Sequence, residues 1–184
     1  MQTRHLIIPG VLAFSIACES DRIAVPSELH QHGTTEFLAA KAEPNGADLA
    51  ALRQATAPFH EFAAATTAGW NTAITDCMSS PEGGMGFHYA KVGLLDAVIN
   101  PAEPEALLFE PEKNGKLRLV GVEYIVPRTA WTGTTPPELY GQQYAYVPAF
   151  DVYGLHAWVW KNNPSGMFAP WNPVVSCEHA PATP

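Results

Sequence analysis

The chain has 184 residues, of which 47% are hydrophobic and 15% are charged. This length and composition are sufficient for one domain with a packed core. The 10 basic and 18 acidic residues give a net charge of −8. Such a balance argues against nucleic acid, or an anionic membrane surface, as a binding partner.

The first 17 residues have the pattern of a secretory signal peptide. A short basic segment, residues 1–5, precedes residues 6–17, which are almost entirely apolar and uncharged. This apolar stretch is shorter than the roughly 20 residues that a helix needs to cross a bilayer. Residues 14–18 resemble the cleavage box of bacterial lipoproteins, in which the cysteine becomes lipidated. We expect export to the periplasm or cell envelope with a lipid anchor at Cys18; the alternative is an ordinary signal peptide cleaved near Ala17.

The rest of the chain divides by composition into three parts. Residues 18–45 are interrupted by Pro26 and Pro44 and sustain no hydrophobic period, which is typical of a tether. Residues 46–178 carry the periodic segments and are expected to form a single domain. Residues 179–184 are rich in Pro and Ala, so we expect a flexible tail there.

The first periodic segment predicts a helix over residues 48–68. Apolar positions recur at steps of three and four residues and form one stripe. The stripe consists of Leu49, Leu52, Thr56, Phe59, Ala63 and Thr66. Pro58 lies in the middle of the segment, so we expect a kink or two abutting helices. Gly69 is a natural end of the helix.

Short runs of branched and aromatic residues follow, separated by Pro, Gly and Asn, and they predict five strands. These runs are residues 85–90, 106–110, 116–126, 143–147 and 155–160. A hairpin turn is expected at residues 112–115, which end in Asn-Gly. A helical segment followed by mostly antiparallel strands indicates an α+β fold. The helix would pack on a mainly antiparallel sheet or on an open barrel.

The two cysteines of the expected domain, Cys77 and Cys177, predict a disulfide in an oxidising compartment. Closing so long a loop would stabilise the fold by roughly 4–5 kcal/mol. Neither cysteine has a CxxC neighbour, which argues against a structural zinc site. The alternative is a pair of free or metal-bound thiolates.

Glu123 is the most unusual residue of the predicted strands. Period-two alternation places Leu119, Gly121, Glu123 and Ile125 on one face, and both faces are apolar near the middle of the strand. A buried carboxylate is costly unless it is paired or binds a cation. The sequence must therefore supply it with a partner.

Two histidines on other predicted strands are the candidate partners. His88 has small neighbours on its own face, and alternation places His156 on one face with Trp158 and Trp160. If His88, Glu123 and His156 converge, they could hold Zn, Cu, Fe or Mn with an open coordination position, and His60 is a fourth candidate ligand. The alternative is a buried His–Glu hydrogen bond that only organises the core.

These residues leave three classes of function open. The first is an exported, lipid-anchored protein that binds a small molecule or a metal ion at the His/Glu site, with the membrane reached only through the anchor. The second is a hydrolase- or lyase-type enzyme in which Glu123 or a histidine is the general base. The third is an accessory subunit that docks a partner through exposed aromatics. Separately, four tyrosines interspersed with Gly and Pro could form a ligand platform or a sugar-binding wall, or only the rim of a sandwich: Tyr140, Tyr144, Tyr146 and Tyr153.

Three segments carry a resemblance to other proteins. They are residues 84–89, residues 119–124 and residues 156–168, followed by Asn172-Pro173 and Cys177. Between about residues 55 and 177 the chain resembles a group of uncharacterised exported bacterial proteins. The resemblance implies no activity. It implies that His88, Glu123 and His156 belong to one site.

Overall fold

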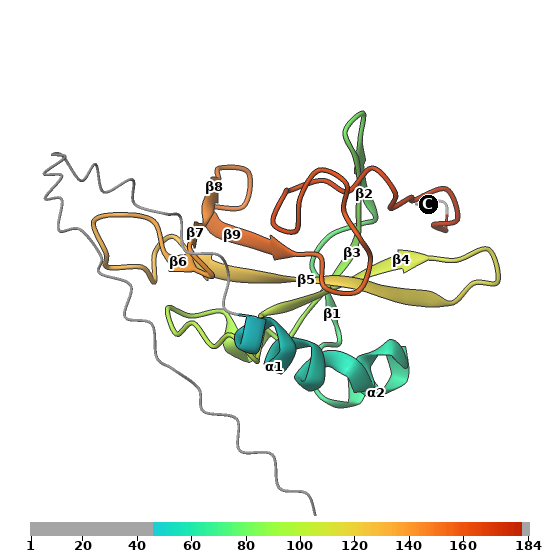
Figure 1. Cartoon of the computed structure of the whole chain (residues 1–184), viewed down its shortest axis with the longest axis horizontal. Coiled ribbons are helices and arrows are strands. Elements are labelled where there is room, and N and C mark those ends of the chain that lie inside the picture. The colour runs from blue at the N-terminus through green and yellow to red at the C-terminus, as the bar shows by residue number, and fades with distance from the viewer. Residues whose placement is uncertain (1–45, 182–184) are drawn as a thin grey trace, which may run out of the picture. The chain divides into compact units, whose positions relative to one another are not determined.

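The computed structural model describes residues 46–181. The expected signal peptide, the lipidation site Cys18 and the expected tether lie outside the described residues. Within them, helices lie on one side of a mainly antiparallel sheet, so the α+β prediction is confirmed (Figure 1). None of the helices between residues 46 and 181 has the length and apolar character needed to span a membrane.

The predicted helix consists of three segments. They are the α-helix α1 (Gly46–Thr56), the 3₁₀ turn η1 (Ala57–His60) and the α-helix α2 (Phe62–Thr67). Pro58 is the second residue of the 3₁₀ turn, and the α-helical ladder ends there because a proline lacks the N–H that would continue it. Glu61 then adopts an extended conformation before α2 starts. The break expected at Pro58 is therefore present.

The apolar stripe does not continue unchanged through this break, contrary to the sequence prediction. In α1 the buried residues are Leu49, Leu52 and Thr56, as expected. In α2 the buried residue is Ala65, whereas Ala63 is exposed. A 3₁₀ turn has three residues per turn rather than 3.6, so it rotates the following helix relative to the first.

The main sheet is antiparallel throughout and open. Its order is β1 (Thr72–Ala73), β3 (Gly83–Ala90), β4 (Ala106–Pro111), β5 (Leu117–Pro127), β9 (Val152–Ala157) and β8 (Ala145–Val147), and β2 (Met78–Ser80) also pairs with β3. The strands β6 (Glu138–Leu139) and β7 (Gln142–Gln143) form a separate pair, and η2 (Val92–Leu94) is a 3₁₀ turn. Among the described residues, β1 and β8 end the sheet without pairing to each other, so the sheet is not closed.

Three of the predicted strands agree with the structure within two residues at each end, and the other two differ by more. The run 143–147 is divided between β7 and β8. The run 155–160 is displaced towards the N-terminus, because β9 begins at Val152 and ends at Ala157. Beyond β9, the backbone N–H groups of Trp160 and Lys161 both donate to the carbonyl of Val120, at 3.3 and 3.0 Å. The chain therefore turns away from the ladder where a longer strand was expected.

A bulge in β5 changes which residues share a face. Leu108 pairs with Gly121 and Phe109 pairs with Leu119, so Val120 is the additional residue. As a result Leu119 packs in the core beneath the helices and Val120 packs on the other side. Simple alternation had placed Leu119 with Glu123. The bulge is the reason that this part of the face prediction is wrong.

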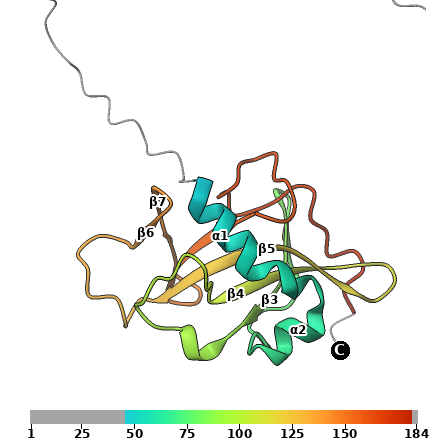
Figure 2. The same cartoon turned by 60° about the horizontal axis from the view of Figure 1, so that its bottom comes forward.

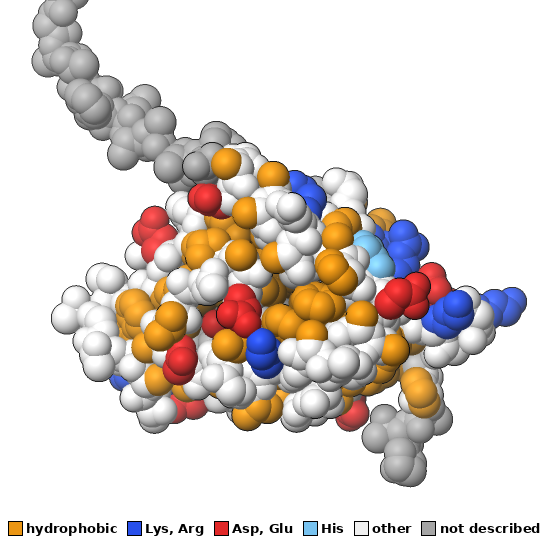
Figure 3. Space-filling view, turned by 90° about the horizontal axis from the view of Figure 1, so that it is seen from below, with side chains coloured by type: hydrophobic (Ala, Val, Ile, Leu, Met, Phe, Trp, Pro, Cys, Tyr) orange, Lys and Arg blue, Asp and Glu red, His pale blue; other side chains and the backbone are white. Residues whose placement is uncertain are grey.

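The helices cover one face of β3, β4 and β5 (Figure 2). The core between the two layers contains Leu52, Phe109, Leu119, Val122 and Tyr124 among its buried residues. Phe62 of α2 contacts Phe109 edge to face, with ring centroids 5.2 Å apart. Seen from the helix side, the described surface mixes apolar side chains with acidic and basic ones (Figure 3). Glu123, His88 and His156 belong to the other face of the sheet.

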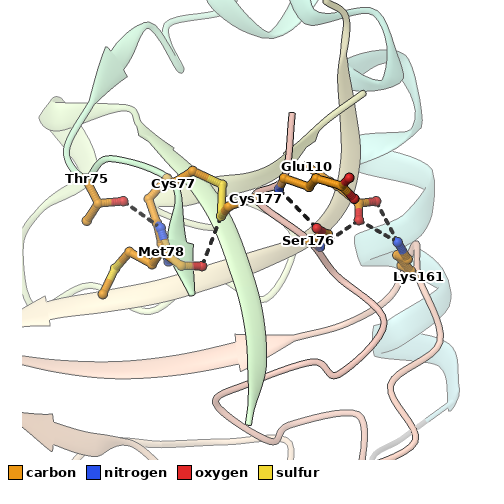
Figure 4. The surroundings of a disulfide bond; sticks show 9 residues. Thr75, Cys77, Met78, Glu110, Lys161, Ser176 and Cys177 are labelled. Atoms are coloured by element: carbon orange, nitrogen blue, oxygen red, sulfur yellow. Dashed lines mark hydrogen bonds and ion pairs between the residues drawn. A yellow bond between two sulfur atoms is a disulfide. The ribbon is translucent and has the colours of Figure 1, made fainter. Parts of the chain in front are cut away.

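The C-terminal segment lies on this other side of the sheet (Figure 1). The predicted disulfide is present and joins Cys77 to Cys177, with Cα atoms 5.7 Å apart. Next to it, the Glu110 carboxylate accepts hydrogen bonds from the Lys161 ammonium at 2.6 and 2.7 Å and from the Ser176 N–H at 2.9 Å (Figure 4). The segment is therefore fixed both covalently and by a half-buried ion pair. The sequence predicts a flexible tail over residues 179–184, and the structure describes residues 179–181 of it.

The four tyrosines considered as a ligand platform are not all exposed. Tyr140 and Tyr144 are buried in the core beneath the helices. The hydroxyl groups of Tyr124 and Tyr140 lie 2.9 Å apart, and both donate to the carbonyl of Pro101. Tyr153 is half-buried, so of the four only Tyr146 is exposed. A platform formed by all four is therefore wrong, because two of them are needed to fill the core.

A second buried acid, Glu105, makes the stability of the fold depend on pH. Burial, together with the charges of Asp96 and Glu103, raises the pKa of Glu105 from 4.5 to about 7, although Ile125 N–H donates to its carboxylate at 3.0 Å. The folded protein therefore holds this proton at a pH at which the unfolded chain has lost it. This contribution to stability is complete below about pH 4.5 and is lost as the pH rises to about 7.

We expect Glu105→Gln to remove this contribution to the pH dependence. Relative to wild type, the variant should gain stability as the pH rises from 4.5 to 7, because its side chain cannot ionise. Urea denaturation of both proteins at several pH values measures the difference between their free energies of unfolding. The buried histidines are present in both proteins, so their contribution cancels in this difference. Glu138→Gln, at an exposed position, is the matched control. If the difference in free energy of unfolding between Glu105→Gln and wild type stays constant from pH 4.5 to 7, Glu105 is not the source of this pH dependence.

Candidate metal site

Three strands of the sheet bring three of the predicted site residues together. Glu123 on β5 lies directly opposite His156 on β9. His88 comes from β3, which is separated from β5 by β4. The residue of β4 that pairs with Glu123 is Ala106, whose side chain ends at Cβ. His88 and Glu123 can therefore meet above β4, although strands two apart are separated by roughly 10 Å.

The ligand atoms of these residues form a compact group. His88 Nε2 lies 3.3 Å from Glu123 Oε2 and 3.4 Å from His156 Nε2, and His156 Nε2 lies 3.9 Å from Glu123 Oε1. All three residues are buried, with exposed fractions of 3% for His88 and 8% for the two others. The burial expected for Glu123 and its pairing with imidazoles are thus both confirmed.

These separations match the edges of a coordination polyhedron. Bonds of roughly 2.0–2.2 Å to a tetrahedral ion place neighbouring ligand atoms roughly 3.3–3.6 Å apart. Two separations lie in this range, from His88 Nε2 to Glu123 Oε2 at 3.3 Å and from His88 Nε2 to His156 Nε2 at 3.4 Å. His156 Nε2 lies 3.9 Å from the other carboxylate oxygen, Oε1. His88, Glu123 and His156 could therefore hold one metal ion as a His₂Glu set. Three protein ligands leave a coordination position open.

Burial favours the uncharged form of each group. Burial lowers the pKa of His88 to about 4. Burial, and then the charge of the neighbouring His88, lower the pKa of His156 to about 3. Burial, together with the charge of Glu105, raises the pKa of Glu123 to about 8. At neutral pH both imidazoles are therefore neutral, which is the form that binds a metal. A divalent cation would favour the carboxylate of Glu123 and release its proton.

A fourth residue fixes the orientation of His88. The Nδ1 atom of this imidazole lies 2.9 Å from the hydroxyl oxygen of Thr75. If Nε2 binds a metal, Nδ1 carries the proton and donates to Thr75. A partner of this kind fixes both the ring and the tautomer of a metal-binding histidine. Thr75 lies two residues before Cys77, so the disulfide constrains the loop that carries it.

Two further contacts position the other ligands. The His156 ring stacks on Trp158, with ring centroids 5.8 Å apart and an interplanar angle of 10°. The Glu123 carboxylate lies above Gly154, where an added Cβ atom would stand 2.7 Å from Oε1. Glycine at position 154 therefore provides the space that the carboxylate occupies.

The structure does not bring His60 into this group. His60 follows Pro58 in η1, and its ring contacts Trp160 edge to face with centroids 4.3 Å apart. Trp160 also donates from Nε1 to Thr56 of α1, at 3.0 Å. Both rings thus lie against the helices. His60 as a fourth ligand is wrong, because η1 places it against Trp160 and apart from the other three residues. Trp160 as a neighbour of His156 is wrong, because the chain leaves β9 at Ala157.

Two cavities adjoin the His₂Glu group. The larger, of about 260 Å³, is lined by His88, Glu123, His156 and Thr75 and otherwise by apolar side chains. The smaller, of about 140 Å³, shares Glu123 and His156 with it. The group is therefore buried but reachable, which suits a site that takes a ligand.

Sequence reasoning did not identify Thr75, Gly154 or Ala106 as parts of this site. Thr75 lies in a loop without hydrophobic periodicity, between β1 and β2. Gly154 and Ala106 act through the space that they leave free, and only the pairing of β4, β5 and β9 shows where that space is needed. The one available signal was a small residue at or directly before the start of a predicted strand, Ala106 in the first case and Gly154 in the second.

Comparisons with known proteins add no identification. No protein-family model matches the chain, and neither a curated protein nor a solved structure matches it. The inference of function consequently depends on the geometry of the site and on the disulfide. The disulfide indicates an oxidising environment.

Proposed function

We propose that this protein binds a divalent first-row transition metal ion, Zn, Cu, Fe or Mn, through His88, Glu123 and His156. The observation that carries the proposal is the spacing of the three ligand atoms, which all lie within 4.8 Å of one another. A buried acid beside two buried imidazoles is costly for a fold to maintain. A bound cation would offset this cost, because it stabilises the carboxylate and uses the lone pairs of both imidazoles.

We further propose that the protein works outside the cytoplasm, anchored to a membrane by a lipid on Cys18. The signal-like leader and the lipoprotein-like segment 14–18 support this location. The disulfide between Cys77 and Cys177 is consistent with it. Resemblance to exported bacterial proteins supports the same location.

The test is metal binding by the purified, disulfide-bonded protein. The protein is titrated with Zn, Cu, Fe and Mn ions, and wild type should bind one ion of at least one of these metals per chain, measured by elemental analysis and by calorimetric titration. His88→Ala and His156→Ala should each lower the affinity on the order of 100-fold or more, because loss of a ligand costs more than the 10–100-fold typical of an outer-shell partner.

His60→Ala is the matched control. This variant also removes a histidine, but one that contacts Trp160 and not the His₂Glu group. Its affinity for the metal should therefore equal that of wild type. The proposal is contradicted if wild type binds none of the four metals more tightly than His88→Ala does. Circular dichroism of each variant shows whether the fold is retained.

A second candidate function is a metal-dependent hydrolase or lyase. The specific observation in its favour is that three protein ligands leave a position open, as in catalytic zinc sites. The larger of the two cavities is lined by all three residues. Turnover that requires the metal and is lost in His88→Ala, but not in His60→Ala, would distinguish an enzyme from a binding protein.

A further inference from the structure

The pocket beside the His₂Glu group is apolar everywhere except at the group itself. Its other walls are formed by apolar side chains, among them Met78, Met85, Leu95, Ile125 and Val152. The polar lining residues are Thr75 and the three proposed ligands. A molecule that fills about 260 Å³ here therefore meets polar partners in one region and apolar walls elsewhere.

The charge of the proposed site defines the head of such a molecule. A divalent ion held by two neutral imidazoles and one carboxylate keeps a net charge of +1. No lysine or arginine lines the described pocket. An anionic head placed on the ion would be neutralised there, and it would have no other cationic partner in the pocket. A cationic head would be repelled.

The mouth of the pocket is apolar as well. Ile74 and Phe150 line it and are 38% and 55% exposed, although they are large hydrophobic residues. Phe150 lies in the turn between β8 and β9, in which the Phe150 N–H donates to the Val147 carbonyl at 3.2 Å. Exposed apolar side chains around a cavity are typical of a ligand entrance.

We propose that this pocket binds a small molecule with an apolar body and a single anionic head group. The head coordinates the metal ion at its open position, and the body lies along Ile125, Val152 and Met78. This inference rests on the proposed metal site. The two predictions can still fail separately, since metal binding is measured before any ligand is added.

The experiment uses Co²⁺-loaded protein, whose visible absorption reports changes in the coordination of the ion. Acetate, butanoate, hexanoate and octanoate are the probes. Each methylene transferred from water to the apolar walls should tighten binding about fourfold until the pocket is full. Octanoate should therefore bind at least 100-fold more tightly than acetate. Octylamine, with a body of the same length and a cationic head, should not change the spectrum.

Two variants separate the pocket from the remaining surface. Ile74→Glu introduces a charge at the mouth and should reduce the advantage of octanoate over acetate at least tenfold, while cobalt still binds. Val92→Glu introduces the same charge at a residue that is 54% exposed and does not line the pocket. It should behave as wild type.

Three outcomes overturn the inference in distinguishable ways. If no cobalt spectrum develops in wild type, the proposed metal site fails and the inference fails with it. If cobalt binds but octanoate is no tighter than acetate, the metal site stands and the apolar ligand is wrong. If Ile74→Glu and Val92→Glu lower octanoate affinity equally, the effect comes from overall charge and not from the pocket.

Discussion

Replacing both Cys77 and Cys177 by serine is expected to lower the free energy of unfolding by about 4.7 kcal/mol. The disulfide spans a sequence separation of 100 residues, and the chain-entropy relation gives this value for a loop of that length. Urea denaturation of the variant and of wild type under non-reducing conditions measures the loss. The metal affinity should fall as well, because Cys77 lies between Thr75 and the pocket residue Met78.

Cys18→Ser is the control for this experiment. It removes the proposed lipid attachment site but leaves the disulfide between Cys77 and Cys177 intact, so its midpoint of unfolding should match that of wild type. If the double variant unfolds at the wild-type denaturant concentration, the disulfide contributes little. In that case the contacts of Glu110 with Lys161 and Ser176 are sufficient to hold the C-terminal segment.

Gly154→Ala is expected to weaken metal binding about 10–100-fold with little change in the stability of the fold. The new Cβ atom would lie 2.7 Å from Glu123 Oε1, which is the flexible end of a side chain. The carboxylate must therefore turn away, while the backbone of β9 remains in place. Losses of this size are typical when the orientation of a metal ligand is disturbed. Calorimetric titration with Zn²⁺ and urea denaturation measure the two effects.

Gly93→Ala is the matched control, because an added Cβ atom at that position meets nothing within 4 Å. It should bind Zn²⁺ as wild type does. In the background of Glu123→Gln, Gly154→Ala should cause little further loss, because both changes act on the same ligand. Equal losses in both backgrounds would mean that Gly154 acts by another route.

Local patterns in the sequence were sufficient for much of the fold. Alternation over residues 117–126 placed Glu123 inside the domain, and the period of three and four residues located α1 with Leu49 and Leu52 in the core. Such signals are reliable because they depend only on the repeat of a helix or a strand. They could not locate the bulge at Val120 or the end of β9 at Ala157, since both depend on which residues pair across strands.

The amino-acid sequence by itself determined that this is a disulfide-linked α+β domain with a buried acid and two histidines on strands. Residue type, spacing and periodicity contain that information, because each reflects the cost of exposing apolar surface or of burying charge. Only the tertiary structure decided that β4 separates His88 from Glu123, that Ala106 and Gly154 leave room for the carboxylate, and that the His60 ring lies against Trp160. These arrangements arise from strand order and register, which join segments far apart in the chain and leave no local periodic signal.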